Sequence, residues 1–405
     1  MNNVLKKLGP GLLFAGAAVG VSHLVQSTRA GADFGLGLVW VLLAVHVFKY
    51  PFFQFGPRYA AATGESLLDG YKKLGKVFIV LYFIITFATM FTIQTAVTIV
   101  TAGIASAVFK STLSLQFWTA IITGLCLLIL LIGKYKLLDT LMKVIIITLS
   151  ISTIIAVSVA IPSTTSDTLD FHQILPDTKT GIAFLIAFMG WMPAPLDVSV
   201  WQSLWTVEKS KTTERLTPKT ALFDFNIGYF ATIFLGLGFM CLGYLVMFNS
   251  NETFSGSAAI FASQFIQLYT AHLGNWTYII IGIAALTTMF STTLTTMDAS
   301  PRSMTKSTEL LFNSNQKYGY YSWMLFLSFG TAFIFYFLNS EMAFLIKTAT
   351  IISFLTAPFY AITNYILISS KHTPKAWHPS KSMHILSWLG IAFLISFSIW
   401  YLNSL

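Results

Sequence analysis

The chain has 405 residues, of which 55% are hydrophobic and only 10% are charged. A soluble globular protein carries about 25% charged residues, so this composition excludes a protein whose only solvent is water. The net charge of +9 comes mostly from Lys and Arg in the N-terminal segment and in alternate loops, a distribution typical of the positive-inside rule. It therefore indicates membrane topology and argues against a nucleic-acid partner.

Apolar runs of about 20 residues, the length that crosses a bilayer core, recur along the whole chain. They predict a single all-α transmembrane domain over residues 1–405. The excess of basic residues, Lys6 and Lys7 included, places the N-terminus in the cytoplasm of a bacterial inner (cytoplasmic) membrane. The eleven expected spans are 9–31, 36–61, 77–105, 115–133, 139–161, 181–206, 221–248, 275–298, 321–338, 344–368 and 384–403.

The first and sixth spans are irregular. The first opens with Gly-Pro-Gly at residues 9–11, and it contains Gly16 and Gly20 ahead of the polar His23. The sixth carries the run GWMPAP at residues 190–195. Proline lacks an N–H group and clashes with the preceding helical turn, so the sixth helix is expected to be interrupted there.

The two irregular spans hold the same place in two five-helix halves, about 9–161 and about 181–368, which an extra helix at about 384–403 follows. Non-helical backbone at membrane depth is tolerated where it lines a cavity or is buried in protein. Matched broken helices indicate the substrate site of a secondary transporter. A pair of simple packing kinks is the alternative explanation.

At these residues the sequence resembles the natural resistance-associated macrophage protein (NRAMP) family of proton-coupled divalent-metal transporters. GPG at 9–11 followed by AGADFG at 30–35 is similar to the family's GPG…AGAQFG frame, and Met-Pro at 192–193 resembles its MPH motif. Arg58 followed by Thr-Gly at 63–64 resembles the family's AARLG…TG ending. The resemblance covers the whole chain. It implies a LeuT-like five-plus-five inverted repeat with an additional eleventh helix, and a divalent cation driven by protons as the substrate.

The metal ligands of that family are only partly present. Its DPGN motif falls on residues 20–23, so Gly20 stands in place of the aspartate and His23 in place of the asparagine. Met192 is kept, whereas the MPH histidine falls on Ala194. The resemblance thus leaves His23 and Met192 as candidate metal ligands. This set is incomplete for manganese or magnesium, which prefer carboxylate and carbonyl oxygens.

The residues also support an organic substrate. Gly20 and Ser22 would let a ligand approach the N–H groups that open the second half of helix 1, and helix N-termini attract anions. Trp191 could close one face of a pocket for an organic molecule. A small organic anion or amino-acid-like solute is therefore an alternative substrate to the divalent cation. The candidate binding residues are Gly20, Ser22, His23, Gln26, Trp191, Met192 and Ala194.

Four further residues are candidates for coupling or counter-charge. Lys49 lies in the middle of the second span, where a lysine is costly and usually functional. Asp197, just after Pro195, could titrate in a proton cycle. The hydroxyl groups of Thr292 and Thr295, taken with helix-1 carbonyls, resemble a sodium site of the symporter relatives. Both H⁺ and Na⁺ therefore stay open as coupling ions.

Two other classes of protein fit less well. A non-transporting membrane sensor is the second alternative, but the cytoplasmic loops are short and no signalling domain is evident. An enzyme would need a catalytic set such as Ser/His/Asp, HExxH or a phosphate loop, and none is evident in the sequence. We expect no cofactor, and we expect the lipid bilayer as the surroundings of the protein.

Overall fold

A computed structural model describes residues 8–160, 171–212, 216–248, 255, 257–338 and 342–404, and every described element of regular structure is a helix. Lys6 and Lys7, which the sequence analysis used to orient the chain, lie outside the described residues. In chain order the elements are α2 Pro10–Ala18, the π-helix η1 Ser22–Ser27, α3 Thr28–Phe34, α4 Val39–Thr63, α5 Leu67–Leu74, α6 Lys76–Val108, α7 Leu115–Ala160, α8 Lys179–Trp191, α9 Val198–Thr212, α10 Pro218–Met247, α11 Ala258–Leu273, α12 Thr277–Phe312, α13 Gly319–Leu338, α14 Met342–Ser369, the short 3₁₀ helix η3 Lys375–Trp377 and α15 Lys381–Ser404.

The helices confirm an all-α membrane architecture. Nine helical segments in the described part of the chain are long and apolar enough to cross a bilayer. A tenth span is the bent pair of Pro10–Ala18 and Ser22–Phe34. The sixth predicted span appears as two shorter helices, α8 and α9, on either side of a non-helical stretch. The described helices thus account for the eleven predicted spans.

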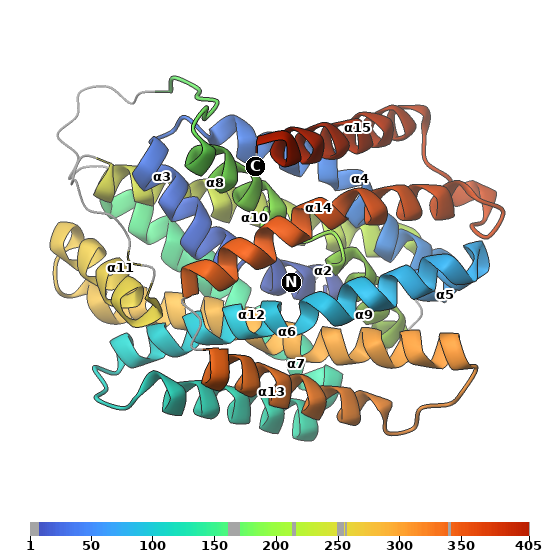
Figure 1. Ribbon diagram of the computed structural model, residues 1–405, viewed down its shortest axis with the longest axis horizontal. Helices are drawn as coiled ribbons and strands as arrows, with labels where there is room; N and C mark the ends of the chain where they lie inside the picture. The colour runs from blue at the N-terminus through green and yellow to red at the C-terminus, as the bar shows by residue number, and fades with distance from the viewer. Residues whose placement is uncertain are drawn as a thin grey trace.

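The helices form two packed groups whose long members run along one direction (Figure 1). In the first group α10 packs against α2, α3 and α4, and α4 packs against α9. In the second group α6 and α12 pack along one another, with α7 and α13 beside them. α14 contacts α8, α4 and α6, and α15 covers α4. The two interrupted helices belong to the first group and face α6 and α12 of the second.

Three connections differ from the sequence prediction. α12 continues to Phe312 instead of ending near 298, and it stops at Asn313, whose φ of 50° is left-handed. The expected loop after the second span contains α5, which begins with a capping box between Ser66 and Asp69. The expected turn at 133–139 is itself helical, so α7 is one element that contains two apolar spans. Polar residues outside the bilayer stay helical here because caps and ion pairs stabilise them.

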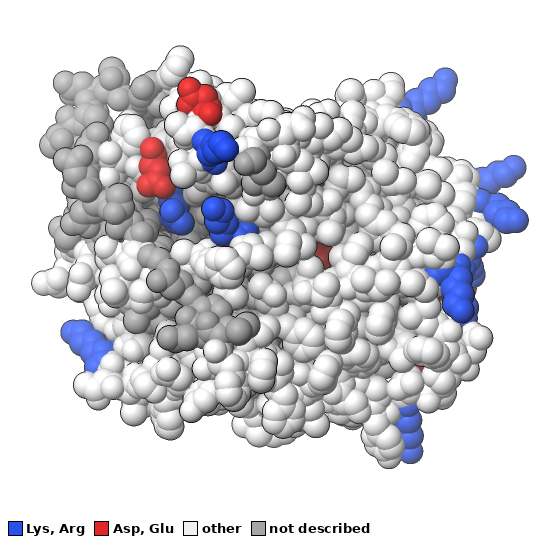
Figure 2. Space-filling model, viewed as in Figure 1, with Lys and Arg blue, Asp and Glu red and all other residues white. Residues whose placement is uncertain are grey.

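Charged side chains avoid the middle of the molecule. Figure 2 shows Lys and Arg gathered at the end of the molecule where α5 and the connections from α12 to α13 and from α14 to α15 lie. A smaller mixed group of basic and acidic side chains lies toward the opposite end, over α3 and α8. The broad middle of this face carries almost no charge, as a surface in contact with lipid tails requires. Cys126 and Cys241 are both free.

Candidate functional site

The first interruption lies between α2 and η1. Helical structure stops at Ala18 and the π-helix begins at Ser22, and the chain bends by 48°. Gly20 lies in this gap, and a Cβ atom there would collide with the side chain of Thr292 on α12. The glycine therefore allows α12 to come into contact with the exposed backbone of helix 1.

The second interruption lies between α8 and α9. α8 ends at Trp191, α9 begins at Val198, and residues 192–197 form no helix. Pro193 and Pro195 cause the interruption, since neither can donate a backbone hydrogen bond. The last carbonyl groups of α8 consequently need donors from elsewhere.

Lys49 of α4 supplies these donors. Its side chain is fully buried, and its Nζ donates to the carbonyl oxygens of Met189 at 2.7 Å, Gly190 at 2.9 Å, Met192 at 3.0 Å and Ala194 at 3.3 Å. A lysine ammonium has three N–H donors, so the four carbonyls share them. The structure thus places the charge of Lys49 directly on the interruption of the sixth span.

Asp197 lies on the other side of the same interruption. Its side chain is buried, and its Oδ1 has no hydrogen-bond partner among the described residues. Its charge acts on Lys49 across the gap. The second interruption therefore contains one cation and one acidic group, and the cation is the one that holds the backbone.

The two candidate metal ligands are both engaged elsewhere. The Nε2 of His23 donates to the carbonyl oxygen of Thr232 on α10 at 3.0 Å, and its Nδ1 lies 2.7 Å from the hydroxyl oxygen of Ser22. Met192 is fully buried in the hydrophobic core. In the described part of the chain, no group of three or more His, Cys, Asp and Glu residues could hold a metal ion.

His46 is a buried histidine that the sequence analysis did not select. Its Nδ1 lies 2.7 Å from the carbonyl oxygen of Leu42, and its Nε2 lies 3.3 Å from the hydroxyl oxygen of Thr232. Thr232 therefore links His46 to His23, whose ring bonds the carbonyl of the same residue. A polar residue in the middle of an apolar span, one helical turn before Lys49, was the signal that could have identified it.

A small cavity of about 30 Å³ lies between the two interruptions. Trp191 and Trp201 give it aromatic walls, and Ser22, Thr292 and Thr296 give it hydroxyl groups. None of its lining residues is charged. Its lining comes from helix 1, α6, the stretch from α8 to α9, and α12: Ala17, Ala18, Val21, Ser22, Ile93, Val97, Trp191, Pro195, Val198, Trp201, Thr292 and Thr296. We call it the central pocket.

The predicted binding residues divide among three places. Ser22 and Trp191 line the central pocket, with Gly20 beside it in the gap of helix 1. Met192 and Ala194 contribute the carbonyls that Lys49 holds. His23 turns toward α10. Gln26 lines a separate outer cavity that is described below.

Hydroxyl groups of α12 meet the opened backbone of helix 1. The hydroxyl oxygen of Thr292 lies 3.1 Å from the carbonyl oxygen of Gly16 and 3.3 Å from that of Val19. The hydroxyl oxygen of Ser291 lies 3.2 Å from the carbonyl oxygen of Gly16. Thr295 instead bonds the carbonyls of its own helix. Of the two predicted threonines, only Thr292 therefore contacts the carbonyls of helix 1.

Charged contacts close the end of the molecule at which α2 begins. The carboxylate of Asp224 accepts hydrogen bonds from the N–H groups of Gly9 at 3.0 Å and Gly11 at 2.6 Å. Lys209 of α9 forms an ion pair with Asp139 of α7 at 2.9 Å. These contacts fix the start of α2 between α10, α9 and α7. We call them the inner clamp.

A second charged cluster on the same side is centred on Asp298 of α12. Arg302 donates to both of its oxygens, at 2.6 and 3.1 Å, while Trp205 and Tyr320 donate at 2.8 Å each. The cluster joins α9, α12 and α13 and adds to the closure of this end.

An open cavity of about 270 Å³ lies toward the other end, between η1 and α3, α8, α11 and α14. Its lining includes Gln26 and Arg29 from helix 1 and Lys347 from α14. Ala187 of α8 lines it, and Trp191, one helical turn further along α8, lines the central pocket. The Nε1 of Trp191 donates to the hydroxyl of Ser353 on α14 at 3.0 Å. We call this cavity the outer vestibule.

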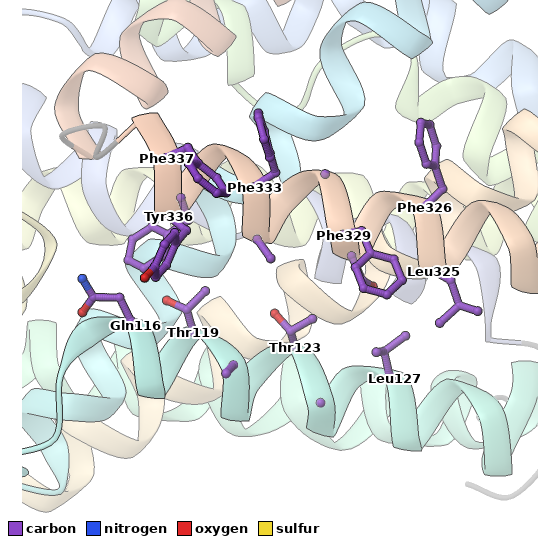
Figure 3. A pocket seen from close by; sticks show the side chains of 16 residues that line it. Gln116, Thr119, Thr123, Leu127, Leu325, Phe326, Phe329, Phe333, Tyr336 and Phe337 are labelled. Atoms are coloured by element: carbon purple, nitrogen blue, oxygen red, sulfur yellow. The ribbon is translucent and has the colours of Figure 1, made fainter.

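A large cavity, of about 980 Å³, lies away from both interruptions (Figure 3). Its walls are α7 and α13, whose Leu127, Leu325 and Phe329 face it together with the polar Thr119 and Thr123. It is mostly apolar and widely open, as a groove on a lipid-facing surface would be. It offers no charged group for transport.

Comparisons with known proteins agree with this architecture. The model of the natural resistance-associated macrophage protein-like family, Nramp, matches residues 11–404. An uncharacterised protein of Pasteurella multocida is 35% identical over 404 residues, which cover 98% of this chain and 91% of that protein.

Solved structures show the same fold at low sequence identity. A manganese transporter of Eremococcus coleocola has a TM-score of 0.76 at 13% identity, with 98% of this chain and 86% of that chain covered. The nucleobase-cation symporter Mhp1 has a TM-score of 0.61 at 13% identity, with coverages of 98% and 92%. MhsT in complex with L-phenylalanine has a TM-score of 0.65 at 13% identity, with coverages of 96% and 98%. These likenesses confirm the LeuT-like inverted repeat.

Proposed function

The chain belongs to the Nramp family, so it is a multi-pass membrane transporter of the Nramp type, and we propose that it carries a small organic solute with an anionic group through the central pocket. It would do so by alternating access in a bacterial inner membrane, with its N-terminus in the cytoplasm. The position of the Lys49 ammonium on the second interruption is the observation that carries this proposal.

The ammonium occupies the place where a transported cation would bind. In this fold the carbonyls at the end of a half-helix are suited to coordinate a cation, and here they already bind the fully buried Lys49. A further unit positive charge brought to about 4 Å from it would cost about 4 kcal/mol at an effective dielectric constant of about 20. A carboxylate would instead be attracted by the same charge.

The walls of the central pocket support the same class of substrate. Trp191 and Trp201 offer flat apolar surfaces, and the hydroxyls of Ser22 and Thr292 offer hydrogen bonds. Pockets for small organic molecules combine apolar and aromatic walls with a few placed polar groups. The N–H groups at the start of η1 would add an attraction for an anion.

A divalent cation is the second candidate, and family membership is what favours it. His23 and Met192 would be its side-chain ligands, with backbone carbonyls completing the set. Both ring nitrogens of His23 already have partners, so this function requires the ring to release Ser22 or Thr232. The solved manganese transporter shares the fold. At this sequence identity the shared fold does not show that the metal ligands are shared.

We infer sodium as the coupling ion, with protons as the alternative. The hydroxyls of Ser291 and Thr292 donate hydrogen bonds to the carbonyl oxygens of Gly16 and Val19, so these four oxygens lie close together between helix 1 and α12. Oxygen ligands of this kind suit hard cations. Proton coupling would instead use Asp197, which is buried and has an unpartnered oxygen.

A thermal-shift screen tests the substrate class. The purified protein would be heated with acetate, L-lactate, L-alanine, L-glutamate, MnCl₂ or MgCl₂, each with and without Na⁺. We expect at least one carboxylate to raise the unfolding midpoint, because a ligand at about 100 times its Kd stabilises the folded state by about 2.7 kcal/mol. Trp191→Ala should abolish the shift, and Trp388→Ala, on the exposed side of α15, should leave it unchanged. A shift with Mn²⁺ alone would establish the metal function instead.

A further inference from the structure

The outer vestibule contains two cationic side chains that no described ion pair neutralises. Arg29 projects from α3 and Lys347 from α14, and both line the same cavity. The ion pairs of the described residues include neither of them. The Arg29 guanidinium lies 5.7 Å from the centre of the Phe184 ring on α8, so an aromatic face helps to position it. The described lining of the cavity therefore contains two basic side chains and no acidic one.

None of the described residues that line the vestibule is acidic. Asp33, one turn beyond Arg29 on α3, interacts electrostatically with it but is not among the residues that line the cavity. All lining residues other than Arg29 and Lys347 are uncharged. Figure 2 shows the basic and acidic side chains of this region side by side at the surface over α3 and α8. A cavity lined by one sign of charge concentrates ions of the opposite sign.

Gln26 adds a specific polar contact to the vestibule. Its side chain is only 4% exposed, it lines the cavity, and its Oε1 has no hydrogen-bond partner among the described residues. A buried acceptor without a donor is costly. A ligand that carries an N–H or O–H group beside its anionic group would satisfy it.

We propose that the outer vestibule is an entry site for small carboxylates that also carry an N–H or O–H donor. Arg29 and Lys347 bind the carboxylate, and the Oε1 of Gln26 accepts the hydrogen bond from the donor. The cavity volume of about 270 Å³ leaves room for a molecule of this size. The site lies one helical turn of α8 outside Trp191, so a bound molecule has to pass this indole to reach the central pocket. This inference rests on the proposed function and names its substrate more narrowly.

Charge-selective labelling of a cysteine tests the vestibule without knowledge of the substrate. Ala183 lines the cavity and is partly exposed, so Ala183→Cys in a Cys126→Ala, Cys241→Ala background gives one reporter thiol. Its reaction rates with an anionic sulfonatoethyl and a cationic trimethylammonium-ethyl methanethiosulfonate are compared at equal ionic strength. The exposed Asn275→Cys gives the reference ratio for an open surface.

We expect the anionic reagent to be favoured about tenfold at Ala183→Cys relative to Asn275→Cys, in keeping with the focusing effect of charged clefts. Arg29→Gln with Lys347→Gln should remove this preference. Lys110→Gln should keep it, because Lys110 is exposed and stacks on Tyr278 outside the cavity. Raising the salt concentration should weaken the preference in the unmodified background, which gives a measurement that does not depend on the folding of the charge variants. Equal ratios at the two cysteines would overturn the inference.

Protection experiments separate this inference from the proposed function. L-lactate, which carries a hydroxyl donor, should slow labelling of Ala183→Cys more than acetate does, and Gln26→Leu should abolish the difference. Lactate could protect the cysteine without raising the unfolding midpoint of the protein and without entering liposomes. In that case the entry site stands and the proposed transport function fails. If carboxylates enter liposomes but none of them protects the cysteine, the entry site is wrong and the transport function stands.

Discussion

At the scale of single residues, Lys49 is the side chain on which the site depends. It donates to four carbonyl oxygens, two at the end of α8 and two in the non-helical stretch that follows, and these carbonyls lack helical donors because Pro193 and Pro195 interrupt the helix. One residue thus does two things: it satisfies the broken backbone, and it sets the sign of the local charge.

Replacing this ammonium should damage both stability and transport. Lys49→Met removes the donors and the charge, and a buried carbonyl left without a donor costs about 1–3 kcal/mol. We expect a loss of roughly 3 kcal/mol in the free energy of unfolding, measured by chemical denaturation in detergent, together with loss of uptake. Lys49→Arg keeps the charge and several donors and should retain part of both. The control is Lys76→Met at the exposed start of α6, which should change stability and uptake little. If Lys49→Met changed them as little as Lys76→Met does, this role of Lys49 would be contradicted.

Thr292 and Thr295 allow a matched test of sodium coupling. The hydroxyl of Thr292 lies against the carbonyls of Gly16 and Val19, whereas that of Thr295 bonds its own helix. Thr292→Val should raise the Na⁺ concentration for half-maximal uptake about tenfold, since one lost ligand worth about 1.4 kcal/mol changes affinity by that factor. Thr295→Val should change it little. Identical Na⁺ dependence in the two variants, or none in the wild type, would favour protons.

The sequence located most of these residues but not their contacts. Lys49 stands out because a lysine in the middle of an apolar span is costly, yet its partners lie about 140 positions away and only packing brings them together. Gln26 was expected beside the central pocket and lies in the outer vestibule. It belongs to η1, a π-helix, and a π-helix places successive side chains at different angles from an α-helix. The sequence prediction contained no π-helix at this position.

At the scale of elements, the two interrupted helices were predictable and the ends of the others were not. Glycine and proline in an apolar span give a local signal that needs no tertiary contact, so the gaps at 19–21 and 192–197 match the expected positions. The extension of α12 to Phe312 depends on the contacts of Arg302 with Asp298 and of Lys306 with Asp69. Hydropathy marks where a helix leaves the bilayer, and it does not mark where the helix ends.

The inner clamp is the element whose release should open the site inward. Asp224 holds the N–H groups of Gly9 and Gly11, and Asp224→Ala leaves the start of α2 without this partner. A cysteine at Ala17, which lines the central pocket, should then react severalfold faster with a membrane-impermeant maleimide applied from the side of the clamp. Glu309→Ala, which removes a carboxylate from the same end of the molecule, is the control. Equal reaction rates in the two variants would show that Asp224 does not keep the pocket closed.

At the scale of the whole molecule, the central pocket of about 30 Å³ lies between two ends that differ in their contacts. The inner clamp and the cluster around Asp298 tie the helices together at the end where α2 begins, where a cavity of about 460 Å³ also lies. The outer vestibule lies toward the opposite end. Alternating access needs such an arrangement, in which one end opens while the other is held.

The distribution of charge along this path decides between the two substrate classes. A molecule that enters meets Arg29 and Lys347 first and then the field of Lys49, while the central pocket itself has no charged lining. Each of these cations repels a divalent metal ion and attracts a carboxylate. Under the proposed function, the family scaffold is kept and its electrostatics favour a carboxylate.

Uptake by proteoliposomes tests this account most directly. Purified protein would be reconstituted in liposomes with an inward Na⁺ or H⁺ gradient. A trapped metal indicator would report Mn²⁺ entry, and radiolabelled L-lactate, L-alanine and L-glutamate would report uptake of organic solutes. Liposomes that contain Lys49→Met serve as the control. We predict gradient-driven accumulation of at least one carboxylate, absent with Lys49→Met, and no Mn²⁺ entry above protein-free liposomes. Mn²⁺ entry without uptake of any carboxylate would contradict the account and restore the divalent cation as the substrate.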